Sequence, residues 1–172
     1  MNRKKIVLAG LIMLVQMFLG TPDSQAGNRS AKKIGVGVGL LTEPFPSLVG
    51  YTLAYNLNDH LRLTAGYGSI SSTATNATFD ITTIGVDAKY FLLDWSFTPF
   101  ISAGVSSITG TVSGTGSTSG ISISGTGVVP AAGLGIDWQS WIGFNLGVDY
   151  KIALSSNANH VGIPGVYFGW YF

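Results

Sequence analysis

Apolar side chains occupy every second position in eight segments between Ile34 and Phe172, and this alternation constrains the fold more than any other feature of the chain. Segment 142–151, with the sequence IGFNLGVDYK, is typical, because its even-numbered positions carry Ile, Phe, Leu, Val and Tyr. Period-two alternation places the apolar residues on one face of a β-strand. No stretch after Gly27 shows apolar residues at helical spacing, so the sequence predicts an all-β protein.

The eight segments are each near the roughly ten residues that a tilted strand needs to cross a membrane. They cover residues 34–40, 49–57, 61–68, 84–90, 101–106, 132–138, 142–151 and 166–172. The links between them alternate in length. Short links lie at 58–60, 92–97 and 139–140, and the links at 43–47, 71–80, 107–126 and 155–162 tend to be longer and more polar. Tight turns at one end and loops at the other predict an up-and-down antiparallel barrel.

The residues between the apolar positions indicate which face of the barrel is polar. In a soluble barrel these residues would form the solvent face and include many Lys and Glu. Here only 10% of the chain is charged, and the residues between the apolar positions, which we call the polar phase, are mostly Gly, Ser, Thr and Asn. Its charged members are Arg62, Asp87, Lys89, Asp137, Asp149 and Lys151. The apolar phase of the regular strand cores holds no charge, as a hydrocarbon-facing surface requires. We therefore expect an eight-stranded antiparallel up-and-down transmembrane β-barrel with a polar lumen.

The charges in the lumen have to compensate one another, because the interior of an eight-stranded barrel is just wide enough for side chains to fill it. An unpaired charge there would cost several kcal/mol. We predict a network of ion pairs and hydrogen bonds among these six residues, joined by Asn56 and Asn145. A structural plug is the favoured interpretation, and a gated path for protons or ions is the alternative.

Residues 1–26 have the organisation of a cleaved secretory signal peptide, with a basic start, an apolar run from Ile6 to Leu19, and small residues at Ser24 and Ala26. The apolar run is shorter than the ~20 residues of a transmembrane helix. We expect residues 27–172 to be the mature barrel domain. The chain has no cysteine for disulfides or thiolate metal sites. Its net charge of +1 provides no basic surface for nucleic acid.

Aromatic residues gather near the strand ends, as expected for the two girdles that flank the apolar band of a membrane barrel. The predicted girdle residues are Tyr51, Tyr55, Tyr67, Tyr90, Trp138 and Tyr150.

The last segment, GVYFGWYF at 165–172, resembles the C-terminal signature of bacterial outer-membrane barrels. With TPFISAGV at 98–105 and AGLGIDW at 132–138, it is similar to small barrels of the OmpA transmembrane domain and OmpX type. The resemblance implies a monomer integral to the cell outer membrane, with both termini in the periplasm and with outer-membrane lipids and lipopolysaccharide around it. During biogenesis it implies periplasmic chaperones and the barrel-assembly machinery as partners. That machinery would read an assembly signal formed by Val166, Phe168, Trp170 and Phe172.

The sequence predicts no catalytic, cofactor-binding or metal site, and no enzyme. His60 lies in a short link and His160 in the last long link, so the two histidines cannot share a site on this topology. Ser155, Ser156 and His160 could form a partial nucleophile and base pair, as in a lipid A acyl hydrolase, but they lack an orienting partner. We therefore expect a structural or surface-interaction role, in membrane integrity or adhesion, without an open pore. Small-solute passage and lipid modification are the alternatives.

The long link at 107–126 contains an internal repeat, because SGTG occurs at 113–116 and again at 124–127. One interpretation is a projecting β-hairpin with its tip near residues 117–120, whose edge could recruit a partner strand. The other is a flexible loop rich in Gly, Ser and Thr.

Overall fold

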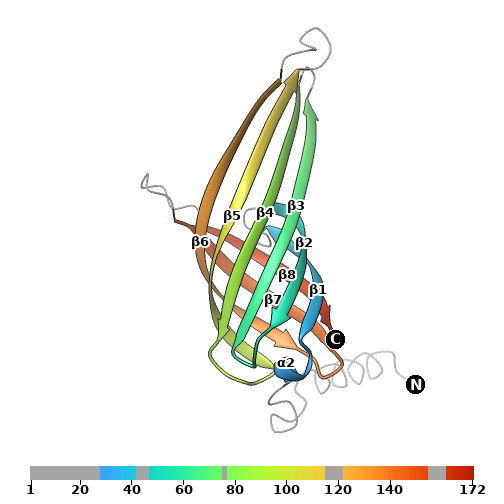
Figure 1. Cartoon of the computed structure of the whole chain (residues 1–172), viewed down its shortest axis with the longest axis vertical. Coiled ribbons are helices and arrows are strands. Elements are labelled where there is room, and N and C mark those ends of the chain that lie inside the picture. The colour runs from blue at the N-terminus through green and yellow to red at the C-terminus, as the bar shows by residue number, and fades with distance from the viewer. Residues whose placement is uncertain (1–27, 42–46, 75–76, 115–121, 155–161) are drawn as a thin grey trace, which may run out of the picture.

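The computed structural model describes residues 28–41, 47–74, 77–114, 122–154 and 162–172. These residues form eight strands that close into a barrel in sequential order, each antiparallel to its neighbours, with β1 paired to β8 (Figure 1). The predicted fold class is confirmed. The signal peptide predicted at residues 1–26 lies outside the described residues and stays a prediction.

The strands are β1 (Ile34–Leu41), β2 (Ser47–Asn56), β3 (Leu61–Ala74), β4 (Ala77–Phe91), β5 (Phe97–Gly114), β6 (Ser122–Gln139), β7 (Phe144–Ala153) and β8 (Gly162–Tyr171). One helical turn, α2 (Asn28–Ala31), precedes β1. The sequence did not indicate this turn, because four residues are too few for helical periodicity to register. Among the described residues, no helix is long and apolar enough to cross a membrane.

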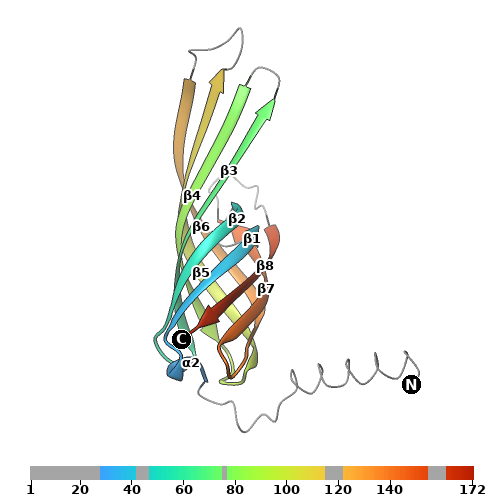
Figure 2. The same cartoon turned by 90° about the vertical axis from the view of Figure 1, so that its right-hand side faces the viewer.

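The turns after β2, β4 and β6 lie at the same end of the barrel as α2 and the C-terminus (Figures 1 and 2). The third turn is longer than expected, because β7 begins at Phe144 and leaves Ile142 in the turn. Gly143 has a φ of 104°, a conformation that favours glycine. Its backbone N–H donates to the carbonyl of Ser140 at 3.0 Å, and its carbonyl accepts from the N–H of Tyr171 at 2.8 Å. This turn therefore ties β7 to the end of β8.

The four strands β3 to β6 are longer than the sequence predicted, with 14, 15, 18 and 18 residues. Residues 71–80 were expected to form a loop and residues 107–126 either a projecting hairpin or a flexible loop, but strand pairing continues to Ala74 opposite Ala77 and to Ser113 opposite Ser122. The loop interpretation was wrong because these segments are rich in Ser, Thr, Ile and Val, of which Thr, Ile and Val favour β-strands. The hairpin interpretation of 107–126 is thus the one the structure supports, although the tip near 117–120 lies outside the described residues.

These longer strands rise beyond the other four as a projecting sheet (Figures 1 and 2). We call its four segments, 69–74, 77–82, 107–114 and 122–128, the extension. Below it, large apolar side chains face outward, as at Ile101 and Leu134, which are 53% and 63% exposed. Polar side chains such as Thr98 and Asp137 are fully buried inside the barrel.

Candidate functional site

Asp137 on β6 is the centre of a buried polar cluster in the barrel interior. Its Oδ1 accepts a hydrogen bond from Nη2 of Arg29 at 3.0 Å. Its Oδ2 accepts from Nη1 of Arg62 at 2.9 Å, from Nδ2 of Asn145 at 3.0 Å and from the hydroxyl of Tyr167 at 2.7 Å. The carboxylate is completely buried, so these four donors replace water around it.

The guanidinium of Arg62 is surrounded in the same way. Its Nε donates to Oδ1 of Asn56 and its Nη2 to Oε1 of Gln139, both at 2.9 Å. The rings of Phe91 and Tyr171 lie 4.8 and 4.4 Å from its central carbon. A buried arginine in this position gains charge-assisted hydrogen bonds and cation–π contacts in place of hydration.

Arg29 reaches this cluster from α2 and covers the short-turn end of the interior. Its Nη1 donates to the carbonyl of Trp95 at 2.8 Å, and its guanidinium lies 4.2 Å from the centre of the Phe91 ring. Burial lowers the pKa of the Arg29 guanidinium, and the Asp137 carboxylate opposes that shift. Sequence reasoning missed Arg29 because it belongs to no strand. The sequence signal that could have indicated this role was a basic residue close after the predicted cleavage site.

The same helical turn is fastened to the first short turn of the barrel. Both the backbone N–H and the hydroxyl of Ser30 donate to the carboxylate of Asp59, at 2.9 and 3.0 Å. The side-chain amide of Asn56 donates to the carbonyl of Lys32 at 2.7 Å. Arg29 is therefore held in the interior by two anchors that follow it directly in the chain, at Ser30 and Lys32.

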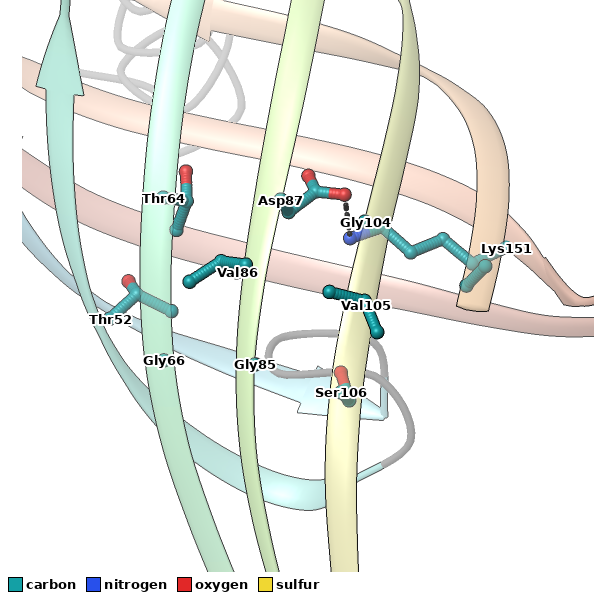
Figure 3. Close-up of a pocket in the computed structure, with 11 residues that line it drawn as sticks. Thr52, Thr64, Gly66, Gly85, Val86, Asp87, Gly104, Val105, Ser106 and Lys151 are labelled. Atoms are coloured by element: carbon teal, nitrogen blue, oxygen red, sulfur yellow. Dashed lines mark ion pairs between the residues drawn. The ribbon is translucent and has the colours of Figure 1, made fainter. Parts of the chain in front are cut away.

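A second group of charges lies closer to the extension. Nζ of Lys151 forms an ion pair with Oδ2 of Asp87 at 3.2 Å (Figure 3) and lies 3.9 Å from Oδ2 of Asp149. Next to this group is a cavity of ≈ 20 Å³, which is room for about one water molecule. The remaining predicted charge, Lys89, is also buried, with Nζ 3.5 Å from the centre of the Tyr167 ring.

The structure thus brings all six predicted charges into the interior, where five of them form two groups and Lys89 lies over the Tyr167 ring. Asn56 and Asn145 both belong to the group around Asp137. A cavity of ≈ 10 Å³ lies between Lys89, Arg62 and Tyr167.

Large aromatic side chains also fill the interior, a placement that was not predicted from the sequence. Tyr167 and Tyr171 of β8 point inward, each across a glycine of a neighbouring strand. A Cβ placed on Gly147 would lie 2.2 Å from Cζ of Tyr167, and one on Gly35 would lie 2.4 Å from Cε1 of Tyr171. The sequence signal for this placement was that Tyr167 and Tyr171 occupy positions between the apolar residues of β8, where other strands carry mostly small residues.

The predicted girdle and assembly-signal residues lie on the outer surface. Tyr51 is 67% exposed, and Tyr55, Tyr67, Tyr90 and Tyr150 are also exposed. Trp138 is half-buried and packs edge-to-face on Phe144, with ring centres 5.8 Å apart. The four assembly-signal residues are all exposed on the same face of the barrel, namely Val166, Phe168, Trp170 and Phe172. Their roles stay predictions.

Of the residues considered for catalysis, the structure describes His60 alone. His60 lies in a short turn with Nδ1 2.9 Å from the carbonyl of Phe91 and its ring stacked on Tyr90. Ser155, Ser156 and His160 lie outside the described residues. The part of the chain that the structure describes contains no group of three or more acidic or histidine side chains suited to a metal ion.

A family model for the outer membrane protein beta-barrel domain matches residues 11–172. Among solved structures, the N-terminal β-barrel domain of Pseudomonas aeruginosa OprF has a TM-score of 0.56 at 16% identity, covering 82% of this chain and 99% of that one. Yersinia pestis Ail, in complex with the heparin analogue sucrose octasulfate, has a TM-score of 0.52 at 16% identity, covering 81% and 96%. At these identities the likeness shows the fold alone. No curated protein matches the sequence.

Proposed function

The chain belongs to the outer membrane protein beta-barrel family and is integral to the outer membrane, and from this premise we propose that it is a plugged barrel with a surface-interaction role. In this proposal the extension stands on the cell surface, and α2 and the C-terminus lie in the periplasm. The protein is a non-enzymatic monomer, in keeping with a family of small barrels that is mostly non-enzymatic.

The packing of the interior supports a barrel without an open pore. The Asp137 cluster, the Lys151 group and the aromatic residues between them occupy the lumen, and Phe91 and Phe100 are almost completely buried there. Two cavities lined by interior residues of the described chain have volumes of ≈ 20 and ≈ 10 Å³, each enough for about one water molecule. These volumes favour a plug over the passage of small solutes.

The unpaired edges of the extension are the observation that carries the proposed surface role. β3 pairs with β2 only as far as Gly68, and β6 pairs with β7 only as far as Ala131. Beyond these residues, one side of β3 and one side of β6 have no neighbouring strand in the described part of the chain. Exposed edges of this kind are templates for an added strand.

The inner face of the extension, which continues the lumen side of the barrel, is apolar. Phe79, Ile81, Val112 and Ile123 are 45%, 43%, 39% and 69% exposed on it. A patch of this kind on a water-exposed sheet is typical of an interaction site. The partner that fits both features is an extended polypeptide that pairs with the edge and adds apolar side chains to the inner face.

The charge of the extension argues against a polyanionic ligand such as the one in the Ail complex. Residues 69–82 and 107–128 contain one charged side chain, Asp80, and neither Lys nor Arg. Sulfate recognition depends on cationic donors, so we do not extend that ligand class to this chain.

A trimmed barrel tests the surface role. Residues 70–81 and 108–127 are each replaced by Asn-Gly, which closes the pairs Ser69–Thr82 and Ser107–Val128 with two-residue hairpin turns. Intact and trimmed proteins in lipid nanodiscs are compared for capture of reduced, carboxymethylated lactalbumin, with native lactalbumin as the control. We expect the intact barrel to bind the unfolded chain and the trimmed barrel to lose this binding. Equal capture by both barrels would refute the proposed role of the extension.

Planar bilayer recordings test the plug separately. We expect no stepwise conductance from the intact barrel. Reproducible channels would favour the solute-passage alternative instead.

A further inference from the structure

The outer face of the extension is covered with hydroxyl groups in register. Residues directly opposite each other on antiparallel strands share a face of the sheet. The row nearest the barrel consists of Ser69, Thr82, Thr109 and Thr126. The next row consists of Ser71, Asp80, Thr111 and Ser124. The third consists of Thr73, Thr78, Ser113 and Ser122. We call these three rows the hydroxyl face.

Side-chain contacts within the rows show that the hydroxyls lie on one side of the sheet. Oγ1 of Thr109 is 3.1 Å from Oγ1 of Thr126, and Oγ1 of Thr73 is 3.3 Å from Oγ1 of Thr78. Strand geometry sets the spacing at about 4.8 Å between strands and about 6.7 Å along a strand. The hydroxyl face is therefore a preordered array of groups that both donate and accept hydrogen bonds.

The hydroxyl face continues the hydrocarbon-facing surface of the barrel without a break. The row just below it consists of Tyr67, Ile84, Ser107 and Val128, of which the three apolar residues are 47%, 58% and 68% exposed. The outer surface thus changes from apolar to hydroxylated over one step of two residues along β3, β4 and β6, and one row earlier along β5. This change marks the level at which hydrocarbon ends and the headgroup layer of the membrane begins.

We propose that the hydroxyl face binds the saccharide headgroups of outer-membrane glycolipids that surround the barrel. Sugar hydroxyls donate and accept hydrogen bonds, as Ser and Thr do, and the Asp80 carboxylate accepts them strongly. The lack of Lys and Arg in residues 69–82 and 107–128 points to the sugar rather than to its phosphate groups. The inference rests on the proposed orientation, with the extension at the cell surface. It is independent of polypeptide capture, which uses the edges and the opposite face.

The test uses the full barrel in nanodiscs that contain equal amounts of a glycolipid with its core saccharide and of the same glycolipid cut back to lipid A. The retained ratio of the two is measured after extraction of excess lipid. The test variant is Thr82→Val/Thr109→Val/Thr126→Val, which removes three hydroxyls but keeps the branched side-chain shape. The control variant, Ile70→Val/Ile81→Val/Ile108→Val, changes the inner face instead. We expect the wild type and the control to prefer the core-bearing glycolipid by about 10-fold, a preference that the test variant loses.

Either of two results would overturn the inference: no preference in the wild type, or the same preference in the test variant. Orientation is tested independently with Gly110→Cys, because the chain has no other cysteine and nothing lies within 4 Å of a Cβ at this position. Labelling of intact cells by a membrane-impermeant maleimide is expected. If this labelling failed, the orientation in the proposed function would be wrong, whereas loss of glycolipid preference alone would leave it standing.

Discussion

Asp137 is the side chain on which the barrel interior depends most, because α2 and three strands send donors to it. Two of these donors, Arg29 and Arg62, are cations that are almost completely excluded from water. A buried ion pair is costly to break from one side, since the remaining charge has lost both its hydration and its partner. The acceptor in this cluster is therefore more important to stability than any one of its donors.

Asp137→Ala is expected to lower the free energy of unfolding by about 3–5 kcal/mol, because it leaves two buried guanidinium groups without their shared carboxylate. Urea unfolding of the barrel in lipid vesicles measures the change. Asp80→Asn removes an exposed carboxylate and serves as the control, with an expected effect within about 0.5 kcal/mol. Equal stabilities of the two variants would contradict the role assigned to Asp137.

A glycine on β7 allows Tyr167 to reach this cluster. Gly147→Ala is expected to displace the Tyr167 ring from Asp137 and to lower the free energy of unfolding by about 1–3 kcal/mol, the cost of overpacking. Gly125→Ala on β6 is the matched control, because a Cβ there meets nothing within 4 Å. The same urea titration compares them. A neutral Gly147→Ala would show that Tyr167 has room to move.

At the scale of the strands, the main feature is that the apolar and polar phases exchange faces above the barrel. Within the barrel, the outer positions of β4 are apolar, as at Ile84 and Val86, and Lys89 faces inward. In the extension the outer positions include Thr82 and the inner ones Ile81. The upper part of β4 therefore remains a strand while its surroundings change from hydrocarbon to water and headgroups. Because its outward residues are polar there, it was predicted to be a loop.

Amide exchange distinguishes the strands of the extension from one another. β5 has neighbours on both sides over residues 107–113, so all its amides there are expected to exchange slowly. β6 has a neighbour on one side only over residues 122–128, so protection is expected to alternate from one residue to the next. Hydrogen exchange followed by NMR in nanodiscs measures both patterns. Uniformly fast exchange over 107–128 would restore the flexible-loop interpretation.

At the scale of the whole molecule, the polarity of the barrel is reversed relative to a soluble protein. Charged side chains such as Arg62 and Asp137 are inside, and Leu53, Leu134 and Phe168 are among the large apolar residues exposed outside. Such a surface is stable only against lipid or detergent, because exposed apolar area in water favours association.

The folded barrel is accordingly expected to stay monodisperse only in the presence of an amphiphile. Its unheated form should also migrate differently from the boiled form on a denaturing gel, because the closed sheet unfolds only on heating. Size-exclusion chromatography with and without detergent, together with the gel, measures both properties. A chain that remained folded and monomeric in plain buffer would refute the membrane assignment.

The sequence by itself determined the closed eight-stranded barrel and the outward face of the apolar residues in its alternating segments. Alternation is a local property, and side chains such as Leu134 and Asp137 reveal their faces through their own chemistry. The tertiary structure decided which residues meet across the lumen, as Arg29 and Tyr167 do at Asp137. It also decided how far β3 to β6 continue. Both outcomes depend on contacts between residues distant in sequence, and no local pattern specifies the partner of a side chain or of a strand edge.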